Sequence, residues 1–199
     1  MGGVLLALIF AWGAELLSAQ EMKDRKGEEA NENALIEMTI KGIALQPGTH
    51  DPVIVLVDKA RTKALPIWIG FFEARAIAME MEHVPAPRPM THDLIKNMLE
   101  GLKAKVKKIT ITELNNGTFF AAITFLIRSA EVSVDSRPSD AIALAVRVNA
   151  PVYVVRKVLD HANTIQLTQE KLKDEEKNWR KWLEDLPPNP SEEGQKLEL

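Results

Sequence analysis

The chain has 199 residues, of which 46% are hydrophobic and 27% are charged, the mixture of an ordinary globular protein. It contains no cysteine, which excludes disulfides, zinc–thiolate sites and cysteine nucleophiles. The 25 basic and 28 acidic residues give a net charge of −3, which argues against an unspecific polyanion binder with a broad basic surface.

The first twenty residues predict a signal peptide. Residues 4–12 form an apolar run too short to span a bilayer comfortably, and Ser18 and Ala19 provide the small residues of a cleavage point after Ala19. No Lys or Arg precedes the run and Glu15 interrupts its end, so the alternative is an uncleaved amphipathic helix or a start assigned too early. We therefore expect a periplasmic or extracellular protein without stable membrane anchoring after cleavage; the alternative location is cytoplasmic.

Residues 21–34 are charged and nearly free of large apolar side chains, which predicts a linker. Folded structure is expected from residue 35, where β-branched residues and partial alternation begin. The first half of the domain contains three predicted strands and one helix, at residues 35–45, 53–57, 65–69 and 71–83. A turn rich in Pro and Gly at residues 46–52 separates the first two strands.

The second half repeats this order. The predicted strands and helix lie at residues 106–114, 119–127, 131–134 and 137–148. Asn115, Asn116 and Gly117 predict a hairpin turn, because Asn and Gly tolerate positive φ. Pro138 suits the first turn of the helix, and Pro151 ends it before a last strand at residues 152–155.

The two halves align over residues 53–80 and 120–147 without a gap, which favours an internal duplication. We predict an α+β domain at residues 35–157, with a mixed sheet built from two repeated β-β-β-α units. A connecting helix with Thr91 as N-cap joins the units. A charged helical extension at residues 158–187, with its helix over residues 168–186, and a flexible tail at 188–199 are expected to follow.

Six residues at three predicted helix starts are candidate functional residues: Glu73, Arg88, His92, Asp93, Arg137 and Asp140. A helix start favours anions through its free N–H groups and its dipole. A carboxylate in the first turn usually satisfies those same groups, and the arginines can pair with the carboxylates, so a purely structural role is the alternative. The sequence has no phosphate-binding loop, no HExxH, no GxSxG and no GxGxxG.

Three strings resemble the bifunctional nuclease family. They are LPIWIG followed by EA (residues 65–74), RPMTHDL (88–94) and SRPSDAIALAVR followed by a proline (136–151), in this order. The resemblance covers about residues 35–157, and the charged helix after them is similar to the extension of many bacterial members. It implies a mixed α/β domain, often oligomeric, that degrades RNA and DNA. We therefore expect a nuclease with RNA or DNA as substrate, in a homo-oligomer.

In the nuclease hypothesis the catalytic groups are Glu73, His92, Asp93 and Asp140. The carboxylates would hold a divalent cation such as Mg²⁺, and the histidine would act as acid or base near neutral pH. Arg88 and Arg137 would clamp the phosphate. The alternative is a non-catalytic module that binds an anionic ligand or shapes a subunit interface. The low number of candidate catalytic groups and the acidic net charge favour this alternative.

Overall fold

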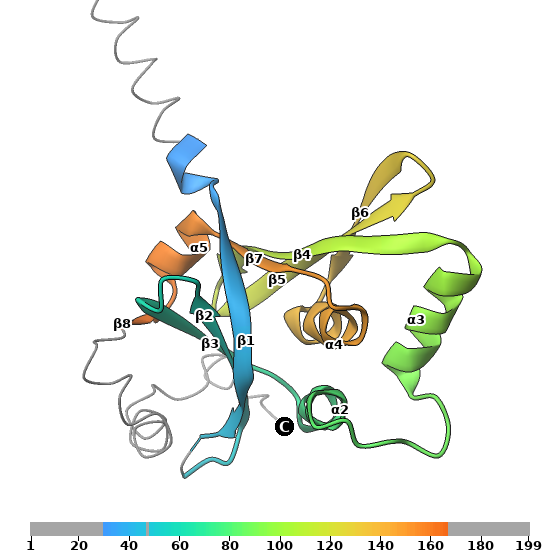
Figure 1. The fold of residues 1–199 in the computed structure, drawn as a ribbon. Coiled ribbons are helices and arrows are strands. Elements are labelled where there is room, and N and C mark those ends of the chain that lie inside the picture. Colours follow the sequence, from blue (N-terminus) through green and yellow to red (C-terminus); the bar gives the residue numbers. More distant parts are fainter. Residues whose placement is uncertain (1–29, 47, 167–199) are drawn as a thin grey trace, which may run out of the picture. The chain divides into compact units, whose positions relative to one another are not determined.

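A computed structural model of the chain describes residues 30–46 and 48–166 (Figure 1). The chain divides after Ala34 into two units, and the fold described below is that of the second unit. The predicted signal peptide, most of the predicted linker, the predicted helix over residues 168–186 and the tail lie outside the described residues. Within the described ranges, no helix is both long and apolar enough to cross a membrane.

The described part of the chain contains one eight-stranded mixed sheet with the strand order β6-β5-β4-β7-β1-β2-β3-β8. The strands are β1 (Leu35–Leu45), β2 (Pro52–Asp58), β3 (Lys63–Trp68), β4 (Ala104–Asn115), β5 (Thr118–Ile127), β6 (Ala130–Ser136), β7 (Val152–Val155) and β8 (Ile165–Gln166). Strand β7 runs parallel to β4 and antiparallel to β1, and so joins two antiparallel groups of strands. The predicted α+β class and mixed sheet are confirmed.

Each group is a three-stranded antiparallel meander followed by a helix, namely β1-β2-β3-α2 and β4-β5-β6-α4. The order of elements thus agrees with the predicted repeat, while duplication as its origin stays a prediction. In the β4–β5 hairpin, Asn116 and Gly117 have φ values of 48° and 77°, as the turn prediction requires.

The described part of this unit contains four helices: α2 (Phe71–Met81), α3 (Thr91–Gly101), α4 (Pro138–Val148) and α5 (Arg156–His161). The prediction for α3 was wrong in one detail, because Met90 and not Thr91 is the N-cap residue. The Met90 N–H is bound by the Asp93 carboxylate at 2.8 Å, so a side chain inside the helix takes over the capping role. Helix α5 was not predicted, because six residues are too few for an apolar period to be visible.

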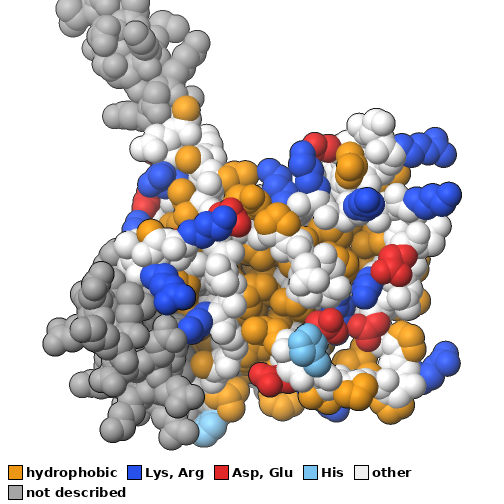
Figure 2. All heavy atoms as spheres, viewed as in Figure 1, with side chains coloured by type: hydrophobic (Ala, Val, Ile, Leu, Met, Phe, Trp, Pro, Cys, Tyr) orange, Lys and Arg blue, Asp and Glu red, His pale blue; other side chains and the backbone are white. Residues whose placement is uncertain are grey.

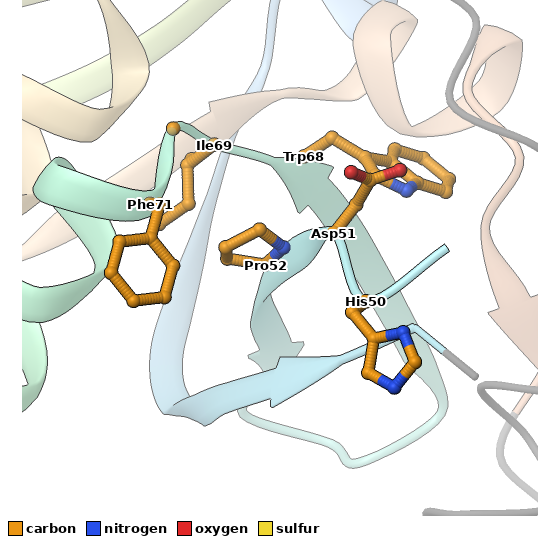
Figure 3. A pocket seen from close by; sticks show the side chains of 7 residues that line it. His50, Asp51, Pro52, Trp68, Ile69 and Phe71 are labelled. Atoms are coloured by element: carbon orange, nitrogen blue, oxygen red, sulfur yellow. The ribbon is translucent and has the colours of Figure 1, made fainter. Parts of the chain in front are cut away.

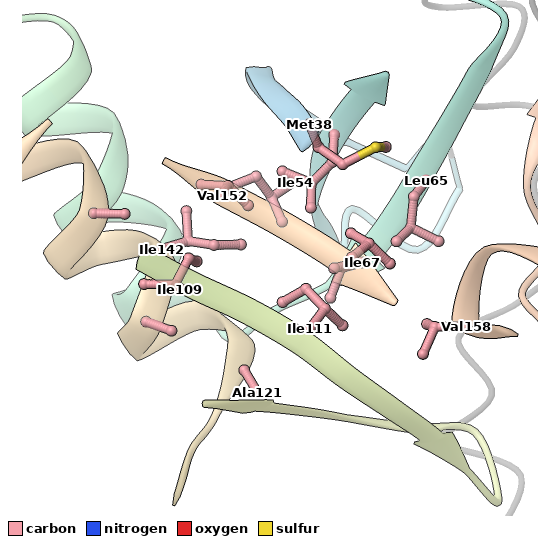
Figure 4. Packing of buried hydrophobic residues seen from close by; sticks show 14 of the residues in the cluster. Met38, Ile54, Leu65, Ile67, Ile109, Ile111, Ala121, Ile142, Val152 and Val158 are labelled. Carbon is pink, nitrogen blue, oxygen red and sulfur yellow. The ribbon is translucent and has the colours of Figure 1, made fainter. Parts of the chain in front are cut away.

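The main hydrophobic core lies between the sheet and the helices (Figure 4). Ile54 and Ile67 of one meander and Ile109 and Ile111 of the other share this core with Ile142 of α4. Helix α4 also contacts both α2 and α3 (Figure 1). It is therefore enclosed on several sides, and its small alanines allow this close approach. This central position brings the first turns of the neighbouring helices close to its own.

Strand β2 is buried on both faces, as its continuous apolar sequence predicted. Ile54 and Leu56 point into the main core, whereas Val53, Val55 and Val57 form a second, smaller cluster with Ala64. Because side chains alternate along a strand, this second cluster lies on the opposite face of the sheet.

Candidate functional site

The first turns of α2, α3 and α4 meet in one charged group of four residues, which we call the Arg137 cluster: Glu73, His92, Arg137 and Asp140. Arg137 Nη1 lies 2.9 Å from Glu73 Oε1, which joins the starts of α4 and α2. His92 Nε2 lies 3.2 Å from Asp140 Oδ1, which joins the starts of α3 and α4. The structure therefore brings together four of the six predicted residues, although 67 residues separate the two carboxylates in the sequence.

Arg137 is the most accessible member of the cluster, with 65% of its side chain exposed. Its Nε donates to Asp140 Oδ2 at 2.7 Å and its Nη2 donates to Asp140 Oδ1 at 3.1 Å. The hydrogen bond and charge of Asp140, and then those of Glu73, raise the pKa of Arg137 above its ordinary value. With the Nη1 contact to Glu73, three of the five guanidinium N–H groups are engaged by described residues, and two are left.

Asp140 is held between Arg137 and His92. Partial burial by itself raises the pKa of this carboxyl, but the hydrogen bonds and charges of Arg137 and His92 lower it below its ordinary value. Asp140 is therefore ionised at neutral pH and can only accept hydrogen bonds. Its side chain is 32% exposed, so solvent reaches the carboxylate.

Glu73 occupies the space in front of the first turn of α2. A Cβ atom added at Gly70 would lie 2.2 Å from Glu73 Oε2, so only glycine leaves room for this position of the carboxylate. Gly70 is the N-cap residue of α2 and provides no side-chain hydrogen bond to the helix. The carboxylate thus lies at the positive end of a helix dipole and beside the Arg137 guanidinium.

His92 is buried, with only 7% of the residue exposed. One ring nitrogen faces Asp140, which would fix the orientation of the imidazole. A ring with so little exposed surface is poorly placed to contact a macromolecular substrate. This burial favours a positioning role, in which His92 holds Asp140 through Oδ1, the oxygen that also accepts a hydrogen bond from Arg137 Nη2.

Asp93 does not belong to the Arg137 cluster, and its contacts were not predicted from the sequence. Its Oδ1 accepts a hydrogen bond of 2.6 Å from Arg147 Nε, and its Oδ2 accepts the one from the Met90 N–H. Arg147 also donates to the carbonyl oxygens of Ala143 and Ala76, at 2.8 and 3.1 Å. Partial burial raises the pKa of Asp93, but the Arg147 and Met90 hydrogen bonds and nearby positive charge lower it below its ordinary value.

Arg147 is the site residue that sequence reasoning missed. Its side chain is 2% exposed and ties α4 to both α2 and α3. One signal was available: a single arginine interrupts the apolar run of α4, and a charge inside such a helix needs a buried partner. The identity of the partner could not be read from the sequence, because Asp93 is 54 residues away.

Arg88 is exposed in the connection between α2 and α3. Within the described residues its side chain makes no hydrogen bond or ion pair with the Arg137 cluster, so the structure does not join it to the other candidates. The predicted metal site also lacks a ready geometry. In the described part of the chain, no three His, Asp or Glu side chains are grouped so that they could hold a metal ion. Asp93 in particular is engaged by Arg147.

A pocket of about 450 Å³ opens beside the start of α2 (Figure 3). Its lining residues are His50, Asp51, Pro52, Trp68, Ile69, Gly70 and Phe71. In the view of Figure 3, Asp51 and Trp68 appear on one side of Pro52 and Phe71 appears on the other. The Trp68 Nε1–H donates to Gln46 Oε1 at 2.8 Å. The lining includes none of the six predicted residues, and the pocket touches the candidate site only through the Gly70–Phe71 junction.

The sequence profile of the bifunctional nuclease domain matches residues 54–166. An uncharacterised protein of Mycobacterium tuberculosis (strain H37Rv) is 35% identical over 160 residues, which are 77% of this chain and 96% of that protein. Bifunctional nuclease 1 of Arabidopsis thaliana is 28% identical over 109 residues, or 53% of this chain and 33% of the plant protein. Bifunctional nuclease 1 of Oryza sativa subsp. indica is 24% identical over 112 residues, or 55% of this chain and 34% of that protein. The matched part of this chain therefore spans about a third of each plant nuclease. With the domain match over more than half of its residues, the chain belongs to the bifunctional nuclease domain family.

Proposed function

We propose that this protein hydrolyses phosphodiester bonds of RNA or DNA at the Arg137 cluster. The main observation behind the proposal is the exposure and the pairing of the Arg137 guanidinium. It is a well-exposed guanidinium with two N–H groups not engaged by described residues, and it lies between two carboxylates at the starts of α2 and α4. Membership of a family named for nuclease activity supports this substrate class.

Phosphate binding follows from the donors at this place. A guanidinium presents N–H groups in a planar fork that matches two phosphate oxygens. The starts of α2 and α4 have no side-chain cap, so their backbone N–H groups and dipoles add positive potential at the same place. These contributions would hold a phosphodiester against the carboxylates that flank Arg137.

Water activation is assigned to the carboxylates. Asp140 is ionised at neutral pH and is oriented by Arg137 and His92, so it can accept a proton or a hydrogen bond from an attacking water. Glu73 is on the other side of the guanidinium and offers a second acceptor. Asp93, by contrast, is assigned a structural role because its partner Arg147 is buried, whereas Arg137, the partner of Asp140, is exposed.

The net charge of the Arg137 cluster makes it necessary to test whether cleavage requires a divalent metal ion. The two carboxylates and the one guanidinium of the cluster together carry one net negative charge, which opposes a phosphate. A divalent cation would offset this charge, but the described residues do not form a three-ligand set for one. The assay therefore compares Mg²⁺, Mn²⁺ and Ca²⁺ with EDTA rather than assuming one ion.

The test is cleavage of end-labelled RNA and DNA by wild type and by Arg137→Gln, Asp140→Asn and Glu73→Gln. We expect Arg137→Gln to lower kcat/KM by about 10²–10³-fold, the loss typical of one donor to a developing negative charge. Arg88→Gln is the matched control, since Arg88 is exposed and outside the cluster. Its rate should equal that of wild type within about twofold.

Two outcomes would overturn the proposal. Equal rates in every variant preparation would show that cleavage does not depend on the Arg137 cluster, whether its source is another part of this protein or a contaminating nuclease. No cleavage of either polymer with any of the three ions would favour the alternative, a module that binds an anionic ligand without catalysis. Phosphate binding by wild type, weakened in Arg137→Gln, would then be the expected remaining property.

A further inference from the structure

Two adjacent phenylalanines are exposed at the start of α2, directly before Glu73. Phe71 is 65% exposed and Phe72 is 78% exposed, and their ring centroids are 6.1 Å apart with an interplanar angle of 81°. Scattered single apolar residues on a surface need no explanation, but two large neighbouring aromatic side chains form a contiguous apolar surface. The Glu73 carboxylate that follows them is the one that contacts Arg137.

An arginine accompanies this aromatic pair. Arg75 follows Phe72 by three residues and Phe71 by four, and side chains at these spacings are neighbours on a helix surface. It is exposed, and within the described residues its guanidinium has no hydrogen bond or ion pair. It differs in this respect from Arg137 and Arg147, which are both paired with carboxylates. The start of α2 therefore carries aromatic rings and an available positive charge together.

The chemistry of this surface favours nucleic acid over a protein partner. Aromatic rings stack on bases, and an arginine binds the phosphates between them, which is the usual composition of surfaces that bind single strands. Helix α3 offers a useful contrast, because its exposed large apolar residues Leu94, Ile95 and Met98 include no aromatic ring. In the view of Figure 2, hydrophobic side chains line the lower edge of the described surface, and acidic side chains lie above them.

We propose that the protein binds single-stranded nucleic acid, with bases stacked on Phe71 and Phe72 and a phosphate held by Arg75. The inference deepens the proposed function and rests on it for one point, namely that a neighbouring phosphodiester reaches Arg137. Bases of a duplex are stacked on each other and cannot use these rings without unpairing. A single strand should therefore bind more tightly than a blunt duplex of the same length.

The experiment measures binding separately from cleavage. Fluorescence anisotropy of a labelled 12-nucleotide oligo(dT), oligo(rU) and a blunt 12-base-pair duplex is recorded in EDTA for the full chain and its variants. We expect Phe72→Leu to weaken single-strand binding by about 5- to 150-fold, the factor that corresponds to about 1–3 kcal/mol for one stacked base. Phe72→Tyr keeps the ring and should stay within about threefold of wild type. Leu102→Ala is the control, since this side chain is 72% exposed at the C-cap of α3, outside the proposed surface.

The outcomes separate the two proposals. Weaker binding in Phe72→Leu and Arg75→Gln, with no cleavage by wild type, would support this inference while the catalytic proposal fails. Cleavage by wild type with unchanged oligonucleotide affinity in both variants would overturn the inference and leave the catalytic proposal intact. Equal affinity for single strand and duplex would also overturn it. So would a change of oligomeric state in Phe72→Leu by analytical ultracentrifugation, because the rings would then serve contact between copies of the chain.

Discussion

The substitution Asp93→Asn tests whether Asp93 is structural, as its contacts indicate, or catalytic, as the sequence predicted. The substitution leaves the Arg147 cation without a carboxylate partner, in a position where only 2% of its side chain is exposed. An uncompensated buried charge costs about 3–5 kcal/mol. The asparagine can still accept one hydrogen bond, but its NH₂ group must then face the Met90 N–H or the guanidinium. A loss of about 3 kcal/mol or more is a large fraction of the stability of about 5–15 kcal/mol expected for a folded protein.

Arg147→Met provides the matched comparison from the other side of the same pair. It leaves the Asp93 carboxylate behind, but this side chain is 30% exposed and keeps the hydrogen bond from the Met90 N–H. Water can therefore hydrate the orphaned charge, and the expected cost is about 1–3 kcal/mol. The prediction is thus an inequality: Asp93→Asn destabilises the protein more than Arg147→Met does.

Urea unfolding followed by circular dichroism gives the two free energies, and calorimetry gives a second measure. For a chain of this size, about 3–5 kcal/mol corresponds to a Tm about 6–20 °C lower. A value for Asp93→Asn within about 1 kcal/mol of wild type would refute the structural role. A larger loss in Arg147→Met than in Asp93→Asn would refute the argument from burial.

Three further predictions concern pH, the start of α2 and the end of α4. Because the pKa values of Asp93 and Asp140 are lowered by folding, their stabilisation is complete above about pH 4 and is lost as pH falls through the lower folded-state values. The difference in unfolding free energy between wild type and Asp93→Asn should therefore shrink between pH 7 and pH 3, and a constant difference would contradict this. Gly70→Ala should move the Glu73 carboxylate away from the helix start and lower cleavage, while the free energy of unfolding changes by less than about 1 kcal/mol. Asn149 ends α4 at φ 52° and ψ 41°, so Asn149→Ala should cost about 1 kcal/mol in urea unfolding and Asn149→Gly should not.

Much of the secondary structure could be predicted from local patterns. The predicted strand at residues 35–45 coincides with β1, and the buried run of β2 and the turn at Asn116 and Gly117 were also predicted correctly. These features depend on side-chain alternation, on burial and on the φ values that Asn and Gly tolerate. All three are determined by residues that are adjacent in the sequence. The start of α3 was missed by one residue because its cap is made by Asp93, three positions inside the helix.

For the candidate site, the sequence alone determined which residues are chemically able to act and that they lie at helix starts. It could not determine how they pair. Glu73 and Asp140 look equivalent to Asp93 in the sequence, since each carboxylate lies in the first turn of a helix. Only the packing of α2 and α3 against α4 places Arg137 between the first two and directs Arg147 to the third. The physical reason is the distance over which each effect acts. Capping and dipole effects act within one helical turn, whereas the pairing of charges depends on which helices the sheet brings side by side.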